Sequence, residues 1–240
     1  PISADAGKRF QAALESGTRL LEEGKLAEGL VELSAWHEHP ELSATERQHL
    51  TSLLDQVAGT VIYSTQHYVL PPHVVKENET LEQIGEFYQV PWQLIAKING
   101  VDDPTSLRPG EELKVVRGPF SAVIHLQKRQ LTLMVNNMYA GRFILGLGRD
   151  MPLREGTFAV TEKRMNPVYH GQGRTIAADD PNNPLGEFWI GIDRDMAIHG
   201  IGPLAEIGST DQPGSAGLSK RDIEDVYDIL TVGSKVLILR

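Results

Sequence analysis

The chain has 240 residues, a formal net charge of −9 and no cysteine. The acidic balance disfavours a nucleic-acid partner, which requires clustered Lys and Arg, and it also disfavours a basic helix lying on a membrane surface. The lack of cysteine removes disulfides, zinc–thiolate sites and any cysteine nucleophile. The apolar fraction of 40% and the charged fraction of 23% are ordinary for a globular protein, and no apolar run approaches the ~20 residues of a membrane span.

The first region, residues 1–66, carries apolar residues at helical spacing and predicts helices that form a small bundle or part of a repeat array. Ser43, followed by Glu46 three positions later, is a capping-box signature that opens the third helix. His37 and His39 suggest a metal, but no further ligand is spaced to complete a site. We therefore expect a solvated loop there, and no metal or cofactor.

The second region, residues 67–117, predicts the order strand, helix, helix, strand. Thr80 is placed to cap the first helix, and Asn99-Gly100 is typical of the end of the second. A closing strand is expected over Glu112 to Val116.

Three motifs in this region resemble those of the LysM domain. The "V-x-x-x-(D/E)-T-L-x-x-I" opening matches Val75 to Ile84, the "L-x-x-x-N-G" middle matches Leu94 to Gly100, and the "L-x-P-G-x-x-L" close matches Leu107 to Leu113. The resemblance implies binding to the N-acetylglucosamine backbone of peptidoglycan or chitin. It places the groove near Glu79, Thr80, Leu81, Ile98 and Asn99. The alternative is a LysM fold kept only as a spacer.

The third region, residues 118–240, changes to short β-rich runs separated by turns. Turns are expected at Lys128-Arg129, at Asn136-Asn137 and over Gly146 to Gly148. Ser219 is placed to cap one helix, and a strand over Val236 to Leu239 closes the chain. We therefore predict an α+β protein whose C-terminal domain is mainly β with one helix.

The stretch around His199 is the strongest candidate for chemistry. A buried-strand pattern delivers His199 into a glycine-rich loop, and Ser215 follows 16 positions later (215 − 199), between Gly214 and Gly217. Such spacing lets a base and a nucleophile meet across a loop. The alternative is a structural histidine beside a glycine turn.

Six blocks in order make this region resemble the L,D-transpeptidase catalytic domain of bacterial cell-wall enzymes, over nearly all of residues 120–240. The resemblance implies acyl transfer on the peptide stems of peptidoglycan, without a cofactor. The matching blocks are Gly156 to Lys163, Asn183 to Gly191, Ile198 to Gly200, Glu206 to Gly208, Leu218 to Tyr227 and Val232 to Ile238.

The family motif "S-H-G-C-x-R" carries a cysteine nucleophile, which this chain lacks. An ungapped register places residues 212–217 on the motif and Ser215 at the nucleophile. A gapped register places residues 215–217 on S-H-G and loses the nucleophile. The resemblance then implies His199 as the base, followed by Gly200, with the amides of Gly214 and Ser215 as the oxyanion hole. A serine hydroxyl is almost wholly neutral at pH 7, so Ser215 reacts only if His199 takes its proton.

Two functions stay open at this point. The first is an acyltransferase that acts on peptidoglycan stems, and the second is a non-catalytic protein that binds peptidoglycan. Under both, the expected partners are glycan strands and peptide stems. Because the chain begins at Pro1, we expect a removed export signal and a location in the periplasm or cell envelope.

Two acidic pairs remain. Asp193 and Asp195 flank an arginine, and this pattern favours a hairpin turn over a site that binds the amine of a diamino acid in the peptide stem. Asp179-Asp180 predicts a polar turn.

Overall fold

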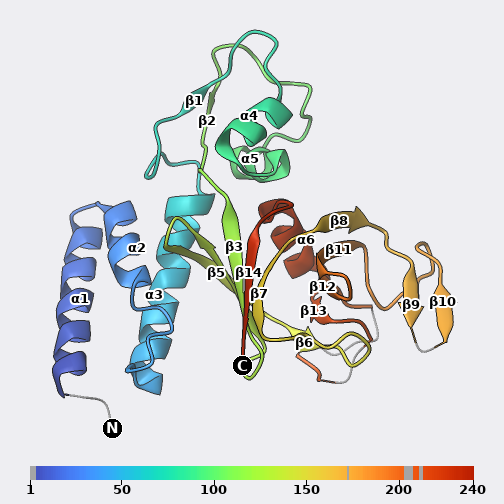
Figure 1. Ribbon diagram of the computed structural model, residues 1–240. Coiled ribbons are helices and arrows are strands. Elements are labelled where there is room, and N and C mark those ends of the chain that lie inside the picture. Colours follow the sequence, from blue (N-terminus) through green and yellow to red (C-terminus); the bar gives the residue numbers. More distant parts are fainter. Residues whose placement is uncertain (1–3, 172, 203–207, 211–212) are drawn as a thin grey trace. The chain divides into compact units, whose positions relative to one another are not determined.

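The computed structural model describes residues 4–171, 173–202, 208–210 and 213–240 (Figure 1). The chain divides into two compact units. The first contains residues 1–88, 94–118 and 134–141, and the second contains residues 89–93, 119–133 and 142–240. Within the described ranges, none of the helices has the length and apolar character needed to cross a bilayer.

Three helices open the first unit: α1 (Ala4–Glu22), α2 (Leu26–Ser34) and α3 (Ala44–Tyr63). The predicted helical region is therefore confirmed. Gly24 adopts a φ of 78° between α1 and α2, which a glycine does at little cost. The helices bury a shared apolar core that includes Phe10, Leu30, Leu33, Leu50, Leu54 and Val61.

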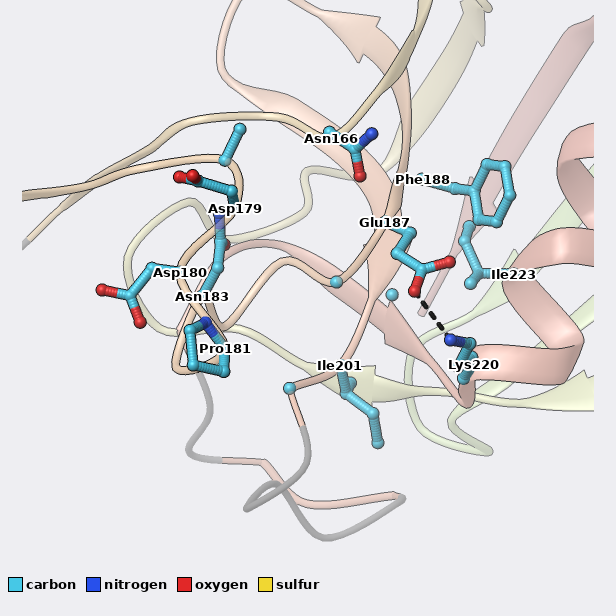
Figure 2. A pocket seen from close by; sticks show the side chains of 14 residues that line it. Asn166, Asp179, Asp180, Pro181, Asn183, Glu187, Phe188, Ile201, Lys220 and Ile223 are labelled. Carbon is cyan, nitrogen blue, oxygen red and sulfur yellow. Dashed lines mark hydrogen bonds and ion pairs between the residues drawn. The ribbon is translucent and has the colours of Figure 1, made fainter.

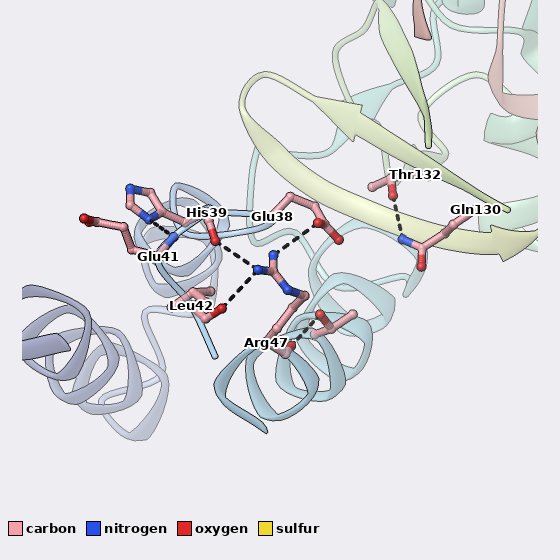
Figure 3. A network of polar contacts seen from close by, with 8 residues as sticks. Glu38, His39, Glu41, Leu42, Arg47, Gln130 and Thr132 are labelled. Atoms are coloured by element: carbon pink, nitrogen blue, oxygen red, sulfur yellow. Dashed lines mark hydrogen bonds and ion pairs between the residues drawn. The ribbon is translucent and has the colours of Figure 1, made fainter. Parts of the chain in front are cut away.

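The predicted capping box at the start of α3 is present. The backbone N–H of Glu46 donates to the Ser43 hydroxyl, and the Glu46 carboxylate accepts from the Ser43 backbone N–H at 2.9 Å. Arg47 then fastens the preceding loop, because its guanidinium contacts the Glu38 carboxylate at 3.2 Å and donates to the carbonyls of His39 and Leu42 (Figure 3). The start of α3 is thus stabilised by the capping box and by the contacts of Arg47 with the preceding loop.

The loop between α2 and α3 is not the solvated loop that the sequence predicts. The His37 ring is partly buried and packs 4.8 Å from the ring of Tyr139, centroid to centroid. Tyr139 is fully buried, and its backbone N–H donates to the Ser34 hydroxyl at 2.9 Å. The prediction fails because the segment that covers this loop is distant in sequence.

Replacing Ser43 by alanine should lower the free energy of unfolding by about 1 kcal/mol, because the Glu46 N–H in the first helical turn loses its acceptor, the Ser43 hydroxyl. Ser52→Ala is a matched control on the exposed face of the same helix. Urea denaturation of both variants measures the difference. An equal midpoint for the two variants would show that the capping box contributes nothing.

Residues after α3 form a small β-α-α-β module, in the order that the sequence predicts. It consists of β1 (His73–Val74), α4 (Leu81–Tyr88), α5 (Trp92–Asn99) and β2 (Glu112–Leu113). The two strands are antiparallel, with His73 opposite Leu113. The closing strand is shorter than the predicted Glu112 to Val116.

Lys114 is a buried cation that joins this module to α3. Its ammonium donates to the carbonyl of Val61 at 2.8 Å and to the carbonyl of Gln66, and only 1% of the residue is exposed. Burial lowers the pKa of Lys114 to about 8. The lysine thus gives a donor to the Val61 carbonyl in the last turn of α3, where carbonyls lack partners within the helix, and to the Gln66 carbonyl beyond the helix.

A five-stranded sheet organises the start of the β domain, with the order β5-β4-β3-β14-β7. The last strand of the chain, β14, lies between β3 and β7, parallel to β3 and antiparallel to β7 (Figure 1). The strands are β3 (Phe120–His125), β4 (Gln130–Val135), β5 (Met138–Ile144), β7 (Gly156–Ala159) and β14 (Lys235–Leu239).

A second five-stranded sheet has the order β6-β13-β12-β11-β8 and carries the site. Its strands are β6 (Gly146–Leu147), β8 (Glu162–Met165), β11 (Phe188–Asp193), β12 (Met196–Gly200) and β13 (Ala216–Leu218), and a separate hairpin pairs β9 (Tyr169–Gly171) with β10 (Arg174–Ile176). The predicted turn over Gly146 to Gly148 is wrong, because Gly146 and Leu147 pair with β13.

One helix, α6 (Lys220–Ile229), packs against β11, β12 and β13. Ser219 caps it as predicted, since its hydroxyl accepts from the Asp222 N–H at 3.1 Å. At the other end the Lys163 ammonium donates to the carbonyls of Tyr227 and Leu230. Burial lowers the pKa of Lys163 to about 8. Both ends of α6 are therefore satisfied by side chains.

Candidate active site

Two parallel strands bring the predicted base and nucleophile together. His199 lies near the end of β12, and Ser215 immediately precedes β13. These strands are parallel neighbours with His199 opposite Gly217, so Ser215 lies two residues before the partner of His199 in the adjacent strand. Residues 203–207 and 211–212 of that loop lie outside the described residues.

The hydrogen bonds of His199 define its tautomer. Its Nδ1 lies 2.6 Å from the Gly200 carbonyl oxygen, which only accepts, so Nδ1 carries the hydrogen. Nε2 is then an acceptor, and it receives the backbone N–H of Ser215 at 2.9 Å. The ring of Trp189 stacks on the imidazole, at a centroid distance of 5.9 Å and an interplanar angle of 17°.

His199 is held in its neutral form. The residue is 0% exposed, and burial lowers its pKa to about 4, although the hydrogen bond to Gly200 opposes that shift. At neutral pH the imidazole is therefore uncharged, with its single acceptor nitrogen already used by a backbone amide. A base must have a free lone pair to take a proton from a nucleophile.

Ser215 is buried to the same degree and its side chain is unsatisfied. The residue is 0% exposed, and its Oγ has no hydrogen-bond partner among the described residues. Its carbonyl accepts from the Gly148 N–H at 2.5 Å. Buried hydroxyls normally find a partner, so the orphaned Oγ is unusual. The serine meets His199 through its backbone and not through its hydroxyl.

The second amide assigned to the oxyanion hole is also engaged. The Gly214 N–H donates to Oδ2 of Asp150 at 3.2 Å, and the Gly214 carbonyl accepts from the Met151 N–H at 3.1 Å. Gly214 has a φ of 87°, and a Cβ there would lie under 3.0 Å from Nε2 of His199. The sequence motifs do not single out Asp150, because it lies in a loop far along the chain from Gly214.

A cavity of about 440 Å³ lies in the same domain, and Gly200, the residue after His199, contributes to its wall. Figure 2 shows the carboxylates of Asp179 and Asp180 on one side, and the Glu187 carboxylate with the apolar side chains of Phe188 and Ile223 on the other. Lys220 makes an ion pair with Glu187 at 2.6 Å. The cavity thus combines an acidic rim and one cation with an apolar wall.

The sequence does not predict this cavity, although it correctly predicts the Asp179-Asp180 turn. Asp180 shapes the turn by accepting the N–H of Asn182 at 2.8 Å. The hairpin turn at Asp193 and Asp195 is likewise confirmed between β11 and β12. Both carboxylates contact the Arg154 guanidinium, at 3.1 and 2.9 Å, so their charge is compensated within the protein.

In the β-α-α-β module, Glu79 and Thr80 serve the start of α4. The Glu79 carboxylate accepts from the Lys76 N–H at 2.8 Å and contacts Nε2 of His73 at 2.9 Å. Burial opposes ionisation of Glu79, but these hydrogen bonds outweigh it and the pKa is lowered. Thr80 caps α4 through the Gln83 N–H, as predicted, and its side chain is exposed.

The other three predicted groove residues are directed inward. Leu81 is 0% exposed and Ile98 is 8% exposed. The Asn99 amide donates to the carbonyls of Ile95 and Lys114 and accepts the Lys114 N–H at 2.7 Å, so it ties α5 to the closing strand. Of the five predicted groove residues, only Thr80 is exposed, and the side chain of Glu79 is 16% exposed.

Comparison with known proteins gives the same two domains. The family model of the LysM domain matches residues 73–116, and that of the L,D-transpeptidase catalytic domain matches residues 119–238, half of the chain. The L,D-transpeptidase-family protein YqjB of Bacillus subtilis (strain 168) is 28% identical over 123 residues, which cover 48% of this chain and 69% of YqjB. ErfK/SrfK of Salmonella typhimurium is 33% identical over 105 residues, which cover 38% of this chain and 34% of that protein.

Solved structures with a similar arrangement include an L,D-transpeptidase from Mycobacterium smegmatis, at 15% identity and a TM-score of 0.43. Another is an L,D-transpeptidase from Mycobacterium tuberculosis H37Rv, at 16% identity and a TM-score of 0.44. The match covers 55% of this chain and less than two thirds of each structure, 64% and 62%. The catalytic-domain model matches half of this chain, and the LysM domain precedes the matched residues. This chain therefore belongs to the L,D-transpeptidase family.

Proposed function

We propose that this chain is a cell-wall protein that binds peptidoglycan and has lost the acyl-transfer chemistry of its family. One observation carries the proposal: Nε2 of His199 accepts the backbone N–H of Ser215, while the Ser215 hydroxyl is buried without a partner. The base is thus occupied and the nucleophile is not activated. The chain also lacks the cysteine that the family chemistry requires.

The register of the decayed motif supports the same reading. Residue 215 is the residue that reaches Nε2 of His199, as the ungapped register requires, and residues 216–218 continue as β13. Ser215 then stands at the nucleophile position, and a serine hydroxyl of ordinary pKa needs a base that can accept its proton.

Binding to the wall is assigned to two places. The LysM domain is the proposed site for glycan strands, on the side of Glu79, Thr80 and the Asn99-Gly100 turn. The acidic cavity beside Gly200 is the proposed site for a peptide stem, because its carboxylates suit an amine and Lys220 suits a carboxylate. We propose the division into a helical region (1–66), a LysM domain (67–117) and a catalytic-type domain (118–240), at the cell envelope.

The second candidate function is a serine acyltransferase. It is favoured by the hydrogen bond from Nδ1 of His199 to the Gly200 carbonyl, which leaves the acceptor nitrogen facing residue 215. If the Ser215 side chain replaced its own amide at Nε2, a base and a nucleophile would be paired as in serine hydrolases.

Intact mass spectrometry separates the two functions. The full chain is incubated with imipenem, a carbapenem, or with a tetrapeptide-stem muropeptide, alongside Ser215→Ala. We expect the mass of the wild-type chain to stay unchanged in both incubations. A covalent adduct that is lost in Ser215→Ala would establish the acyltransferase and overturn the proposal.

Binding is measured by co-sedimentation of the full chain with purified peptidoglycan. Soluble N-acetylglucosamine oligomers should compete if the LysM groove binds glycan, and a free tetrapeptide stem should compete if the acidic cavity binds the stem. Lys220→Gln and Asp179→Asn are expected to weaken the stem competition by several-fold and to leave the glycan competition unchanged. No sedimentation with peptidoglycan would refute a wall-binding role.

A further inference from the structure

Acyl transfer requires N–H groups that are free to receive the negative oxygen formed in the transition state. In this chain both backbone donors beside the nucleophile position already have acceptors. The Ser215 N–H is bound to the imidazole of His199, and the Gly214 N–H is bound to the carboxylate of Asp150. The contact between the Gly214 N–H and Asp150 matters because a carboxylate, like an oxyanion, is negatively charged and accepts hydrogen bonds from N–H groups.

The Asp150 carboxylate is fixed from two directions. Its Oδ2 accepts the Tyr169 hydroxyl at 2.8 Å as well as the Gly214 N–H at 3.2 Å. The side chain of Asp150 is 14% exposed, and Tyr169 is buried on β9 with 1% of the residue exposed. Arg149 lies at the outer oxygen, with Nε 4.0 Å from Oδ1. The carboxylate is therefore placed by a buried partner and not only by surface charge.

The backbone around Asp150 closes on the same two residues. The Gly148 N–H donates to the Ser215 carbonyl and the Met151 N–H donates to the Gly214 carbonyl. Gly148 lies so close that a Cβ on it would overlap the Gly214 carbonyl group. Residues 148–151 thus lie directly against residues 214–215, with the Asp150 side chain completing the contact.

We propose that Asp150 is a positioning residue that closes the catalytic-type centre with its own carboxylate. The carboxylate takes the amide hydrogen that would otherwise be available to an oxyanion or to a small carboxylate ligand. Removal of this side chain then exposes an anion site at the Gly214 amide. The inference deepens the proposed loss of acyl transfer and rests on it, since it assigns a cause for the closed centre beyond the missing cysteine.

The test titrates sodium formate into the full chain and follows the amide resonance of Gly214 by NMR. Asp150→Ala should show a saturable shift of this resonance. Wild type and Asp150→Asn should show a shift at least 10-fold weaker at the same formate concentration, because Asn keeps an oxygen that accepts the same hydrogen. Formamide, which has the same shape without the charge, should leave all three proteins unchanged.

No formate-dependent shift in a folded Asp150→Ala, or an equal shift in wild type, would overturn the proposal. If Asp150→Ala does not fold, hydrogen exchange at the Gly214 amide replaces the titration. Tyr169→Phe should speed that exchange several-fold, whereas Tyr227→Phe, whose ring packs on Phe188 in the same domain, should not. Equal exchange in the two variants would again overturn it. Both readouts are independent of adduct formation at Ser215, so each proposal can fail alone.

Discussion

Lowering the pH from 7 to 4 is expected to reduce the free energy of unfolding by about 3 kcal/mol through His199 alone. The pKa of this histidine is lowered from 6.5 to about 4 by burial in the folded state. One pKa unit corresponds to about 1.4 kcal/mol, so a shift of this size makes a large contribution to the pH dependence of the free energy of unfolding.

The sign follows from which state binds the proton. Between pH 6.5 and 4 the unfolded chain protonates its imidazole while the folded chain keeps His199 neutral. The unfolded state binds more protons in that window, so stability falls as the pH falls. Above pH 6.5 both states are neutral at this residue, and its contribution is fully present.

Urea denaturation across pH 7 to 4 measures the effect, with His199→Gln as the matched control because glutamine does not titrate. Carboxylates whose pKa values are lowered, such as Glu79 and Asp195, contribute in both proteins and cancel in the difference. The difference in unfolding free energy between wild type and His199→Gln should shrink as the pH is lowered. A constant difference would mean that His199 is accessible to protons in the folded state.

Gly214→Ala is expected to lower the free energy of unfolding by about 2–5 kcal/mol. Two penalties act together. Gly214 has a φ of 87°, where an L-residue is strained by about 1–2 kcal/mol. The new Cβ would also overlap the His199 ring, and overpacking of a buried site costs a further ~1–3 kcal/mol.

Gly233→Ala separates these penalties. Gly233 lies in the same domain with a φ of 90°, and a Cβ there meets nothing within 4 Å. It should therefore show the backbone strain without the overlap, a loss of about 1–2 kcal/mol. Thermal or urea unfolding of the two variants gives the comparison. Equal losses in the two variants would show that the Gly214 backbone and the His199 ring do not lie in contact.

His199, Ser215 and Gly214 are buried and joined by backbone hydrogen bonds, and Asp150 and Met151 reinforce them from a separate loop. Catalytic groups need an open lone pair and free donors, whereas here each polar group except the Ser215 hydroxyl has a partner.

Local patterns in the sequence determined much of this protein. The caps at Ser43, Thr80 and Ser219 start their helices where predicted, because a cap depends on residues three positions apart. The motif order of the LysM and catalytic-type domains, and the meeting of His199 with residue 215, also follow from the linear sequence, since fixed spacings between strands set which residues face each other.

Only the tertiary structure decided how the site is closed. Asp150 reaches Gly214, 64 positions away, and Tyr169 holds it from a third segment. The inward direction of Asn99 and the strand at Gly146 and Leu147 likewise depend on partners that are distant in sequence. No spacing rule relates such segments, because their contacts are set by the packing of sheets and loops whose order in space differs from their order in the chain.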